Sequence, residues 1–226
     1  MAYTTIDDPA QHFNTVLYTG DIVDGDGTYH DQAITGMGFQ PDWLWHKGRS
    51  HARQHIWADS VRGTGGSPTQ MLGLSSQDAN AETNSNTNGW VESLDSDGFT
   101  VTSGGDSSSR SNNAGANGNT YVAWGWKAGT TISSTSTSGS GTAKTYTGSV
   151  STTAGFSIIR YVGNQTDAHT IPHHLGAKPD AIIVKHLGDG QQWASYWSPL
   201  GAEKGMRFAT TNAVYDSGTR WSDDEP

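Results

Sequence analysis

Short apolar runs separated by polar turns recur along the chain, and they predict β-strands rather than helices. The clearest run is residues 121–126, where Val122, Trp124 and Trp126 alternate with residues that are mostly small. Because side chains of a strand point alternately to its two faces, this run predicts a central strand with one bulky face and one small-residue face. Further strands are predicted at residues 15–20, 43–47, 90–94, 99–101, 157–163 and 181–184.

The strand around residue 45 occurs a second time in the chain. Residues 41–63, PDWLWHKGRSHARQHIWADSVRG, align without a gap with residues 179–201, PDAIIVKHLGDGQQWASYWSPLG. Both copies begin with Pro-Asp, place a lysine six residues after the proline, and end with a glycine sixteen residues after that lysine. These equal spacings predict an internal repeat and two similar modules.

The predicted fold is all-β, with two tandem β-sandwich modules of which the second is incomplete. Residues 1–14 are a polar lead-in, 15–129 the first module, 130–154 a linker rich in Ser, Thr and Gly, and 155–226 the second module. The second copy stops where the first continues into its last strands. Either the natural chain continues, which is the favoured alternative, or another subunit supplies the missing strands.

The composition agrees with this pattern and narrows the classes of function. Glycine is abundant, with 29 residues, only 15% of residues are charged, and nine Trp supply bulk for a core. The net charge of −9 argues against nucleic acid and anionic membranes as partners. The absence of cysteine excludes disulfides and thiolate chemistry. No apolar run reaches the roughly 18 residues that span a bilayer, and the polar N-terminus does not resemble a signal peptide.

Four motifs of the chain point to a known family. They are the opening MAYTTIDDP, QPDWLWHKGR at residues 40–49, SDGFTV at residues 96–101 and YVAWGWKAG at residues 121–129. Together they resemble virion structural proteins of marine tailed bacteriophages, often described as tail-fibre-like. The resemblance covers nearly all of the first copy and the start of the second. It implies modules similar to concanavalin-type jelly rolls, and it implies no catalytic residues.

The resemblance also implies a location and partners. It implies that the protein is made in the host cytoplasm and resides in the virion, in a fibre, the tail or a head decoration. We expect a symmetric homo-oligomer that contacts other virion proteins. A host surface glycan is an alternative partner, in which case the protein would be a glycan-binding adhesin.

Motifs of the common hydrolases are not found in the sequence. Glycoside hydrolysis needs two suitably spaced carboxyl groups, and the chain has only four glutamates, none of them in a Glu-x-Asp-x-x-Glu arrangement. No serine elbow, phosphate loop or metalloprotease motif occurs. We therefore expect a protein that is not an enzyme, with a polysaccharide depolymerase as a further alternative.

The densest acidic loop is a candidate metal site. Asp21, Asp24 and Asp26 lie in the segment DIVDGDGT, and three carboxylates flanked by glycines could bind Ca²⁺ through oxygen ligands. The alternative is a solvated turn that uses Asp and Gly for their backbone preferences. Apart from Ca²⁺, no cofactor is expected.

A basic segment is a candidate contact for anions or for a neighbouring subunit. Lys47, Arg49 and Arg53 alternate with small or polar residues, and His51 and His55 continue the pattern. In an extended segment all five would share one face. The alternative is an irregular loop whose charges point into water.

Aromatic residues beside polar loops are candidates for stacking on sugar rings. Exposed aromatic rings often mark binding surfaces, and core packing is the alternative for each of them. The candidates are Trp90, Trp193, Tyr196, Trp197 and Trp221.

Overall fold

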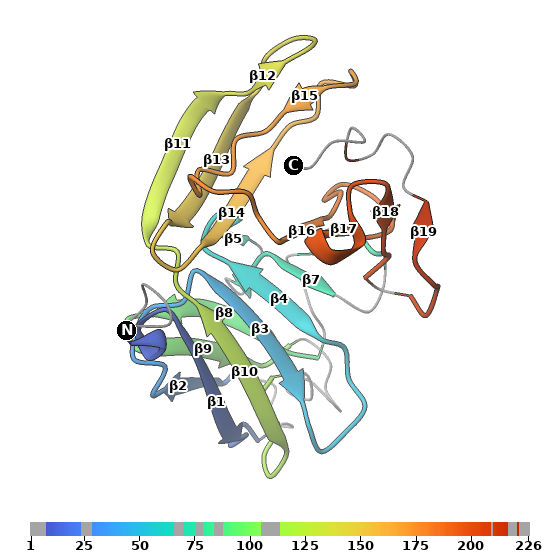
Figure 1. The fold of residues 1–226 in the computed structure, drawn as a ribbon. Helices are drawn as coiled ribbons and strands as arrows, with labels where there is room; N and C mark the ends of the chain where they lie inside the picture. Colours follow the sequence, from blue (N-terminus) through green and yellow to red (C-terminus); the bar gives the residue numbers. More distant parts are fainter. Residues whose placement is uncertain are drawn as a thin grey trace. The chain divides into compact units, whose positions relative to one another are not determined.

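The prediction of an all-β chain is confirmed by the computed structural model, whose strands are labelled in Figure 1. The structure describes residues 8–23, 29–65, 70–75, 79–83, 88–104, 114–208, 210–216 and 221. The chain divides into two compact units, Met1–Ser75 with Glu82–Gly129 and Ser76–Ala81 with Thr130–Pro226. In the described part of the chain, no helix is both long and apolar enough to span a membrane.

The first unit is built from antiparallel strands. These are β1 (Phe13–Thr19), β2 (Asp31–Thr35), β3 (Trp43–Gly48), β4 (Ile56–Asp59), β5 (Thr64–Gly65), β6 (Gln70–Met71), β7 (Gly73–Ser75), β8 (Trp90–Asp95), β9 (Gly98–Thr102) and β10 (Thr120–Trp126), with a 3₁₀ turn, η1 (Pro9–Gln11), before β1. One sheet has the order β1-β10-β3-β4-β7 and the other the order β2-β9-β8. β5 and β6 form a separate hairpin. The predicted central strand is therefore β10.

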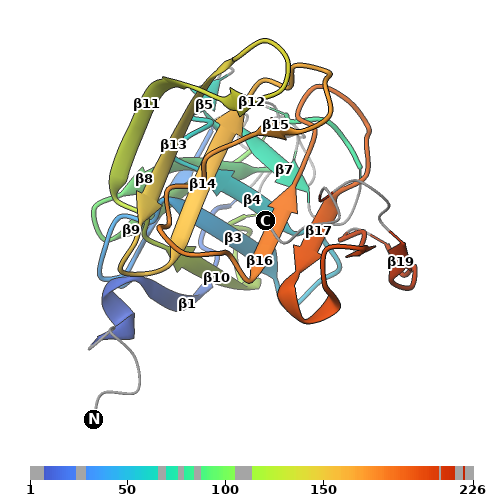
Figure 2. The ribbon, with the colours of Figure 1, turned by 45° about the horizontal axis from the view of Figure 1, so that its top comes forward.

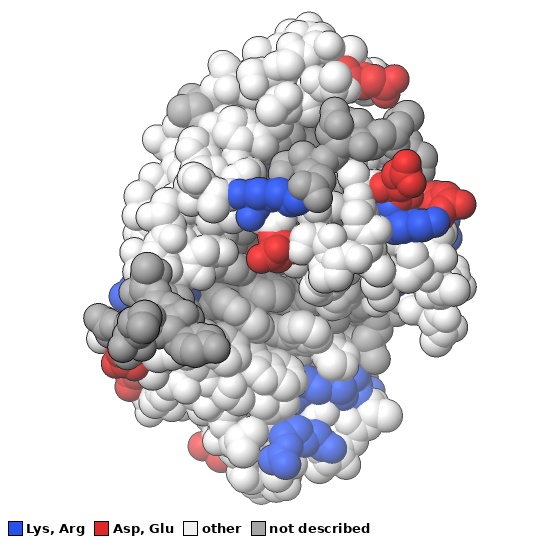
Figure 3. Space-filling model, in the orientation of Figure 1, with Lys and Arg blue, Asp and Glu red and all other residues white. Residues whose placement is uncertain are grey.

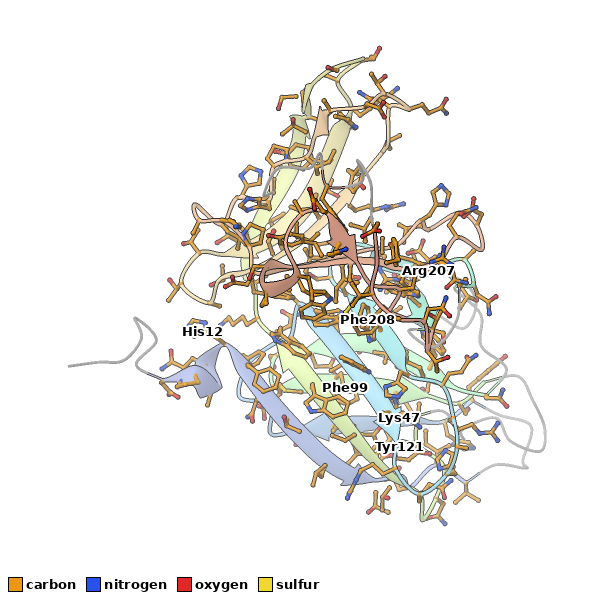
Figure 4. All side chains as sticks on the ribbon, turned by 45° about the vertical axis from the view of Figure 1, so that its right-hand side comes forward. His12, Lys47, Phe99, Tyr121, Arg207 and Phe208 are labelled. Atoms are coloured by element: carbon orange, nitrogen blue, oxygen red, sulfur yellow. The ribbon has the colours of Figure 1, made fainter. Side chains whose placement is uncertain are left out.

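The core of the first unit lies between its two sheets. Leu44, Ile56 and Ala123 of the five-stranded sheet pack with Phe99 and Val101 of the three-stranded sheet, and all five are fully buried. Phe99 is labelled in Figure 4. Each large apolar side chain contributes about 1.5–3 kcal/mol when it is removed from water. The first unit is therefore a β-sandwich stabilised by a continuous apolar layer.

The second unit is also antiparallel. Its elements are β11 (Thr130–Ser136), β12 (Ser138–Gly139), β13 (Thr145–Ser151), β14 (Phe156–Tyr161), β15 (His169–Thr170), β16 (Ala181–Val184), β17 (Ala194–Trp197), η2 (Ser198–Leu200), β18 (Lys204–Gly205) and β19 (Tyr215–Asp216). β11, β13 and β14 form a three-stranded sheet, and β16 pairs with β17. Two short pairs, β12 with β15 and β18 with β19, complete the described strands.

The expectation of a linker at residues 130–154 is wrong, because this segment contains β11, β12 and β13. Its many threonines favour strands, since their β-branched side chains suit a pleated surface. Tyr146 and Val150 of β13 are buried and supply the apolar contacts that the composition obscured. Gly148 leaves room for a neighbour, because a Cβ there would lie 2.6 Å from Cδ1 of Ile159. The low share of bulky residues in residues 130–154 therefore did not indicate a flexible linker.

The repeated sequence folds into the same hairpin twice. β3 and β4 pair with Trp43 opposite Asp59, and β16 and β17 pair with Ala181 opposite Trp197, which are the equivalent positions of the alignment. All four strands begin at equivalent residues of the two copies. The repeat predicted from the sequence is thus a structural repeat in this hairpin.

The landmark residues of the repeat have the same roles in both hairpins. The Ser60 hydroxyl donates to Oδ1 of Asp42 over 2.7 Å, and the Ser198 hydroxyl donates to Oδ1 of Asp180 over the same distance. Nζ of Lys47 donates to two carbonyl oxygens of its hairpin loop, and Nζ of Lys185 does the same in the second copy. The spacings found in the sequence therefore reflect how the hairpin is closed at both ends.

Candidate functional site

Five tryptophans lie together on the outer face of the five-stranded sheet, and we call them the tryptophan face. Trp45 of β3 is opposite Trp124 of β10 and Trp57 of β4, and Trp43 is opposite Trp126. The ring centroid of Trp43 lies 4.3 Å from that of Trp126 and 4.7 Å from that of Trp57. The centroid of Trp45 lies 5.2 Å from that of Trp57 and 5.6 Å from that of Trp124. The indoles therefore form one continuous aromatic cluster across three strands.

The tryptophan face is partly accessible. Trp57 is only 5% exposed, whereas the other four indoles are half-buried. Phe13 of β1 is 38% exposed and extends the cluster, with its ring 4.8 Å from that of Trp126. Charged side chains are few and scattered on the side of the molecule that Figure 3 shows. Partly exposed indoles combine a large apolar area with an N–H donor, which suits the contact of a ring-shaped or aromatic ligand.

The sequence showed the alternation of this region but not which face points inward. The inner face of β10 carries Ala123 and Gly125, both buried. A Cβ at Gly125 would lie 2.8 Å from Sδ of Met37 and 3.3 Å from Cβ of Pro41, so no larger residue fits there. The indoles must therefore point outward. The signal in the sequence was the pair of small residues, Ala123 and Gly125, that alternate with the tryptophans. Small residues mark the tightly packed side of a strand.

The basic segment beside the tryptophan face is an irregular loop over residues 49–55, so the single cationic face expected for an extended segment is not formed. Lys47, near the end of β3 in Figure 4, donates to the carbonyl oxygens of Gly48 and Arg53, each over 2.8 Å. Burial lowers the pKa of Lys47. Contact of Arg49 and Arg53 with a subunit or an anion stays a prediction.

His55 joins this loop to the tryptophan face. The indole N–H of Trp45 donates to Nδ1 of His55 over 2.8 Å. Burial, and after it the charge of Lys47, lowers the pKa of His55. A neutral ring is the form that accepts this hydrogen bond, so the lowered pKa keeps the loop attached to the sheet.

A polar layer lies on the inner side of the same sheet. Tyr18, His46 and Tyr121 stack, with centroids 5.0 Å apart for the two tyrosines and 5.4 Å for His46 and Tyr121. The Tyr18 hydroxyl donates to the carbonyl oxygen of Ala114, so Nε2 of His46, 2.6 Å from that hydroxyl, is the donor to it. Burial lowers the pKa of His46 to about 3 and raises the pKa of Tyr18, so both stay neutral. Nδ1 of His46 has no partner among the described groups.

A buried ion network fixes β4 to the segment that follows it. Nε of Arg62 donates to Oδ2 of Asp59 over 2.5 Å, and its other nitrogens donate to Glu82 over 3.2 Å and to the carbonyl oxygen of Trp57 over 3.1 Å. Asp59 and Arg62 are 5% and 8% exposed. Every hydrogen bond of the guanidinium in this network therefore goes to the framework of the first unit.

Of the aromatic residues that the sequence predicted for glycan contact, three are buried and two are partly exposed. Trp90, Trp193 and Tyr196 are at most 2% exposed and belong to the interior, so they are not available for stacking. Trp90 packs on Gly73, where a Cβ would lie 1.9 Å from the indole ring. Trp197 is partly exposed and donates its indole N–H to the Ser195 hydroxyl over 3.0 Å.

Trp221 is also partly buried, with its ring 5.8 Å from that of Tyr196. The aromatic residues with the best placement for a ligand are thus those of the tryptophan face, which the sequence analysis assigned no binding role.

The candidate Ca²⁺ site is only partly within the described residues. Asp24 and Asp26 lie outside them, and the backbone N–H of Asp21 donates to the side-chain oxygen of Gln32 over 3.2 Å. Among the described residues, no group of three or more His, Asp or Glu side chains is arranged to hold a metal ion. Ca²⁺ binding by this loop stays a prediction.

Glu92 is the one described carboxyl group whose pKa is raised. Burial is the main cause, and the charges of Asp31 and Asp95 add to it. Both carboxylate oxygens of Asp95 accept hydrogen bonds from neighbouring hydroxyls, those of Ser93 at 2.8 Å and Thr100 at 2.7 Å. Asp95 therefore stabilises its own hairpin.

Comparison with known proteins gives a family and no function. A family model described as a domain of unknown function, DUF7483, matches residues 8–226. Searches of the curated proteins and of the solved structures return no match. Because the family model covers well over half of the sequence, the chain belongs to the DUF7483 family.

Proposed function

We propose that this protein is a non-enzymatic structural component of a tailed-phage virion, in a fibre, the tail or a head decoration. The observation that carries the proposal is the repeated hairpin, which has the same register and the same closing hydrogen bonds in both units. Repetition of one structural unit is the usual way to build an extended scaffold. The resemblance of the sequence motifs to phage structural proteins supports this location.

The use of polar side chains supports the same proposal. The carboxylate of Asp42 accepts hydrogen bonds from the backbone N–H groups of Ala128 and Gly129 and from the Ser60 hydroxyl. Asp97 accepts from the backbone N–H groups of Gly36 and Gly38. These charged groups hold turns and strand ends in place, which is the role expected of a scaffold.

The virion proposal is tested by purifying particles of a tailed phage whose genome encodes the chain. The chain should band with intact particles in a density gradient, resist a high-salt wash, and show a fixed copy number per particle by quantitative mass spectrometry. A symmetric homo-oligomer should be seen when the isolated chain is examined by light scattering. Detection of the chain only in the lysate, with none in washed particles, would overturn the proposal.

A second candidate function is binding of a host surface glycan, and the tryptophan face is the observation that favours it. Four of its five indoles are partly accessible, and the separation of the ring centroids shows that the cluster is wider than one sugar ring. Indoles at the centre of an interface commonly dominate binding. This candidate moves the proposed glycan contact from the buried Trp90, Trp193 and Tyr196 to Trp124 and its neighbours.

The glycan candidate predicts that Trp124→Ala weakens binding to host surface polysaccharide about tenfold or more, because it removes a central ring. The matched control is Trp197→Ala, which removes a partly exposed indole outside the tryptophan face. Binding is measured by titration of the polysaccharide with both variants and the parent chain. Equal affinity in all three, or no binding by the parent chain, rules this candidate out.

A further inference from the structure

The outer face of β3 carries cations as well as indoles. Side chains of a strand alternate between its two faces, so Lys47 lies on the same face as Trp43 and Trp45. The backbone N–H of Arg49 still donates to the carbonyl oxygen of Thr120, over 2.7 Å, so the ladder with β10 continues one residue beyond β3. The same alternation therefore directs the side chain of Arg49 to this face.

The loop between β3 and β4 brings a further cation back to this row. Nζ of Lys47 donates to the carbonyl oxygens of Gly48 and Arg53, each over 2.8 Å, so Arg53 lies beside Lys47. The loop ends at β4, which is the neighbour of β3 in the five-stranded sheet (Figure 2). At this end the indole N–H of Trp45 donates to Nδ1 of His55. The loop is therefore fixed to the rim of the tryptophan face.

The cations of this loop have no acidic partner among the described residues. Arg49 is exposed and Arg53 is half-buried, and neither side chain forms an ion pair or donates a hydrogen bond in the described part of the chain. Lys47 uses two of its three N–H groups on the loop itself. Blue Lys and Arg atoms lie at the end of the first unit where Figure 1 draws this loop (Figure 3). Because the chain has 22 Asp and Glu but only 13 Lys and Arg, cations left without a carboxylate indicate a place for an external anion.

The electrostatic field at this edge of the sheet is positive. Burial, and after it the charge of Lys47, lowers the pKa of His55. Burial also lowers the pKa of His46 on the other face, and the charges of Lys47, His51 and His55 add to this shift. No carboxylate is among the causes of either shift. Among the described groups, an anion at the loop is therefore opposed by no charge of its own sign.

Rings and cations follow one another along one line. Successive residues on one face of a strand are about 6.6 Å apart, so the row from Trp43 to Arg49 covers about 20 Å. Neighbouring strands widen the ring half of this row, because Trp124 and Trp57 lie opposite Trp45. A ligand that fills the row needs ring faces at one end and negative groups at the other.

We propose that this row binds an acidic polysaccharide, with sugar rings on the indoles of the tryptophan face and carboxylate groups on Arg49 and Arg53. A guanidinium can hold a carboxylate through two parallel hydrogen bonds, so arginine suits this contact. An indole offers a large, flat apolar area to the face of a sugar ring. The proposal rests on the second candidate function, glycan binding by the tryptophan face, and names the class of glycan.

Nucleic acid also combines rings with negative charge, but the charge of the whole chain opposes it. The net charge is −9, and repulsion by the whole chain grows with the charge density of the ligand. Nucleic acid carries one phosphate per about 3.4 Å of each strand, a far denser charge than one carboxylate per sugar or fewer. Carboxylates of a neighbouring subunit are the other alternative, and they leave the indoles beside the cations without a role.

The probe for this proposal is purified surface polysaccharide of the host, used as isolated and after chemical reduction of its carboxyl groups to alcohols. Reduction removes the negative charge and keeps the sugar rings. We expect the parent chain to bind the unreduced form about tenfold more tightly in isothermal titration calorimetry, because the reduced form loses the charge-assisted contacts. Binding of the unreduced form should also weaken when NaCl is raised from about 50 mM to about 500 mM.

The test variant combines Arg49→Gln with Arg53→Gln. It should bind the unreduced polysaccharide about tenfold more weakly than the parent chain and the reduced form equally well. The matched control combines Lys144→Gln with Arg160→Gln, which removes two charges from the second unit and should leave both affinities unchanged. Trp124→Ala, in contrast, should weaken the binding of both forms, because both keep the sugar rings.

The proposal is overturned if reduction of the carboxyl groups does not change the affinity, or if the test variant and its control bind alike. It is also overturned if single-stranded DNA binds more tightly than the unreduced polysaccharide. A test variant with a changed oligomeric state in light scattering and unchanged polysaccharide binding would assign the loop to a subunit contact instead. In these cases glycan binding by the tryptophan face survives as long as Trp124→Ala weakens the binding of both forms. Absence of any binding by the parent chain is the failure of the second candidate function itself, and it overturns both.

Discussion

Acidification from pH 7 to pH 4 is expected to lower the free energy of unfolding of the first unit by about 3 kcal/mol through His46 alone. His46 is fully buried, and its pKa is lowered to about 3, mainly by burial and further by the charges of Lys47, His51 and His55. In the unfolded chain the same ring has its ordinary pKa of about 6.5. The unfolded state therefore takes up a proton as the pH falls through this range, while the folded state does not.

The sign follows from this difference. The contribution of His46 to stability is fully present above pH 6.5 and is lost progressively between pH 6.5 and pH 3, at about 1.4 kcal/mol per pH unit. The measurement is denaturant unfolding followed by tryptophan fluorescence at several pH values. In His46→Phe this part of the pH dependence should disappear.

A histidine on the surface provides the control for the substitution. The side chain of His186 is 60% exposed and lies 2.9 Å from Asp189, so His186→Gln should change the free energy of unfolding far less than His46→Phe. If the parent chain and His46→Phe lose stability equally between pH 6.5 and pH 4, the neutral, buried state assigned to His46 is wrong.

Replacement of Arg62 by alanine is expected to lower the free energy of unfolding by about 3–5 kcal/mol, because it leaves buried carboxylates without a counter-charge. Asp59 is 5% exposed, and the side chain of Glu82 is 14% exposed. The substitution also removes the hydrogen bond to the carbonyl oxygen of Trp57, which belongs to the central part of the sheet. The loss should appear as a lower midpoint in denaturant unfolding.

An exposed ion pair of the second unit is the matched control for Arg62. Lys204 and Asp216 form a salt bridge whose side chains are 44% and 83% exposed. Lys204→Ala should therefore have no measurable effect on unfolding, because solvent screens such pairs. An Arg62→Ala chain as stable as Lys204→Ala would show that the network around Arg62 does not stabilise the first unit.

Local patterns in the sequence were sufficient for the repeated hairpin. The alternation of residues 43–47 and the shared lysines, Lys47 and Lys185, are determined by backbone geometry within a few residues, so they are visible in the chain itself. The same holds for β10, whose alternating bulky and small residues identified a central strand.

Features that depend on tertiary packing were not visible. Trp90 and Trp124 both lie in alternating segments, yet Trp90 is buried on Gly73 and Trp124 is partly exposed. Whether an indole of such a segment is buried or exposed depends on how the two sheets pack against each other. The strands at residues 130–154 were missed because Ser and Thr resemble a linker in composition, whereas buried Tyr146 and Val150 make them part of a sheet.

The central structural claim is that residues 179–201 repeat the hairpin of residues 41–63, and residue-resolved amide hydrogen exchange tests it most directly. The amides of Ile182 and Val184 should exchange slowly, because they face β17 as those of Leu44 and His46 face β4. Fast exchange at Ile182 and Val184 would show that the second hairpin is not formed and would contradict the claim.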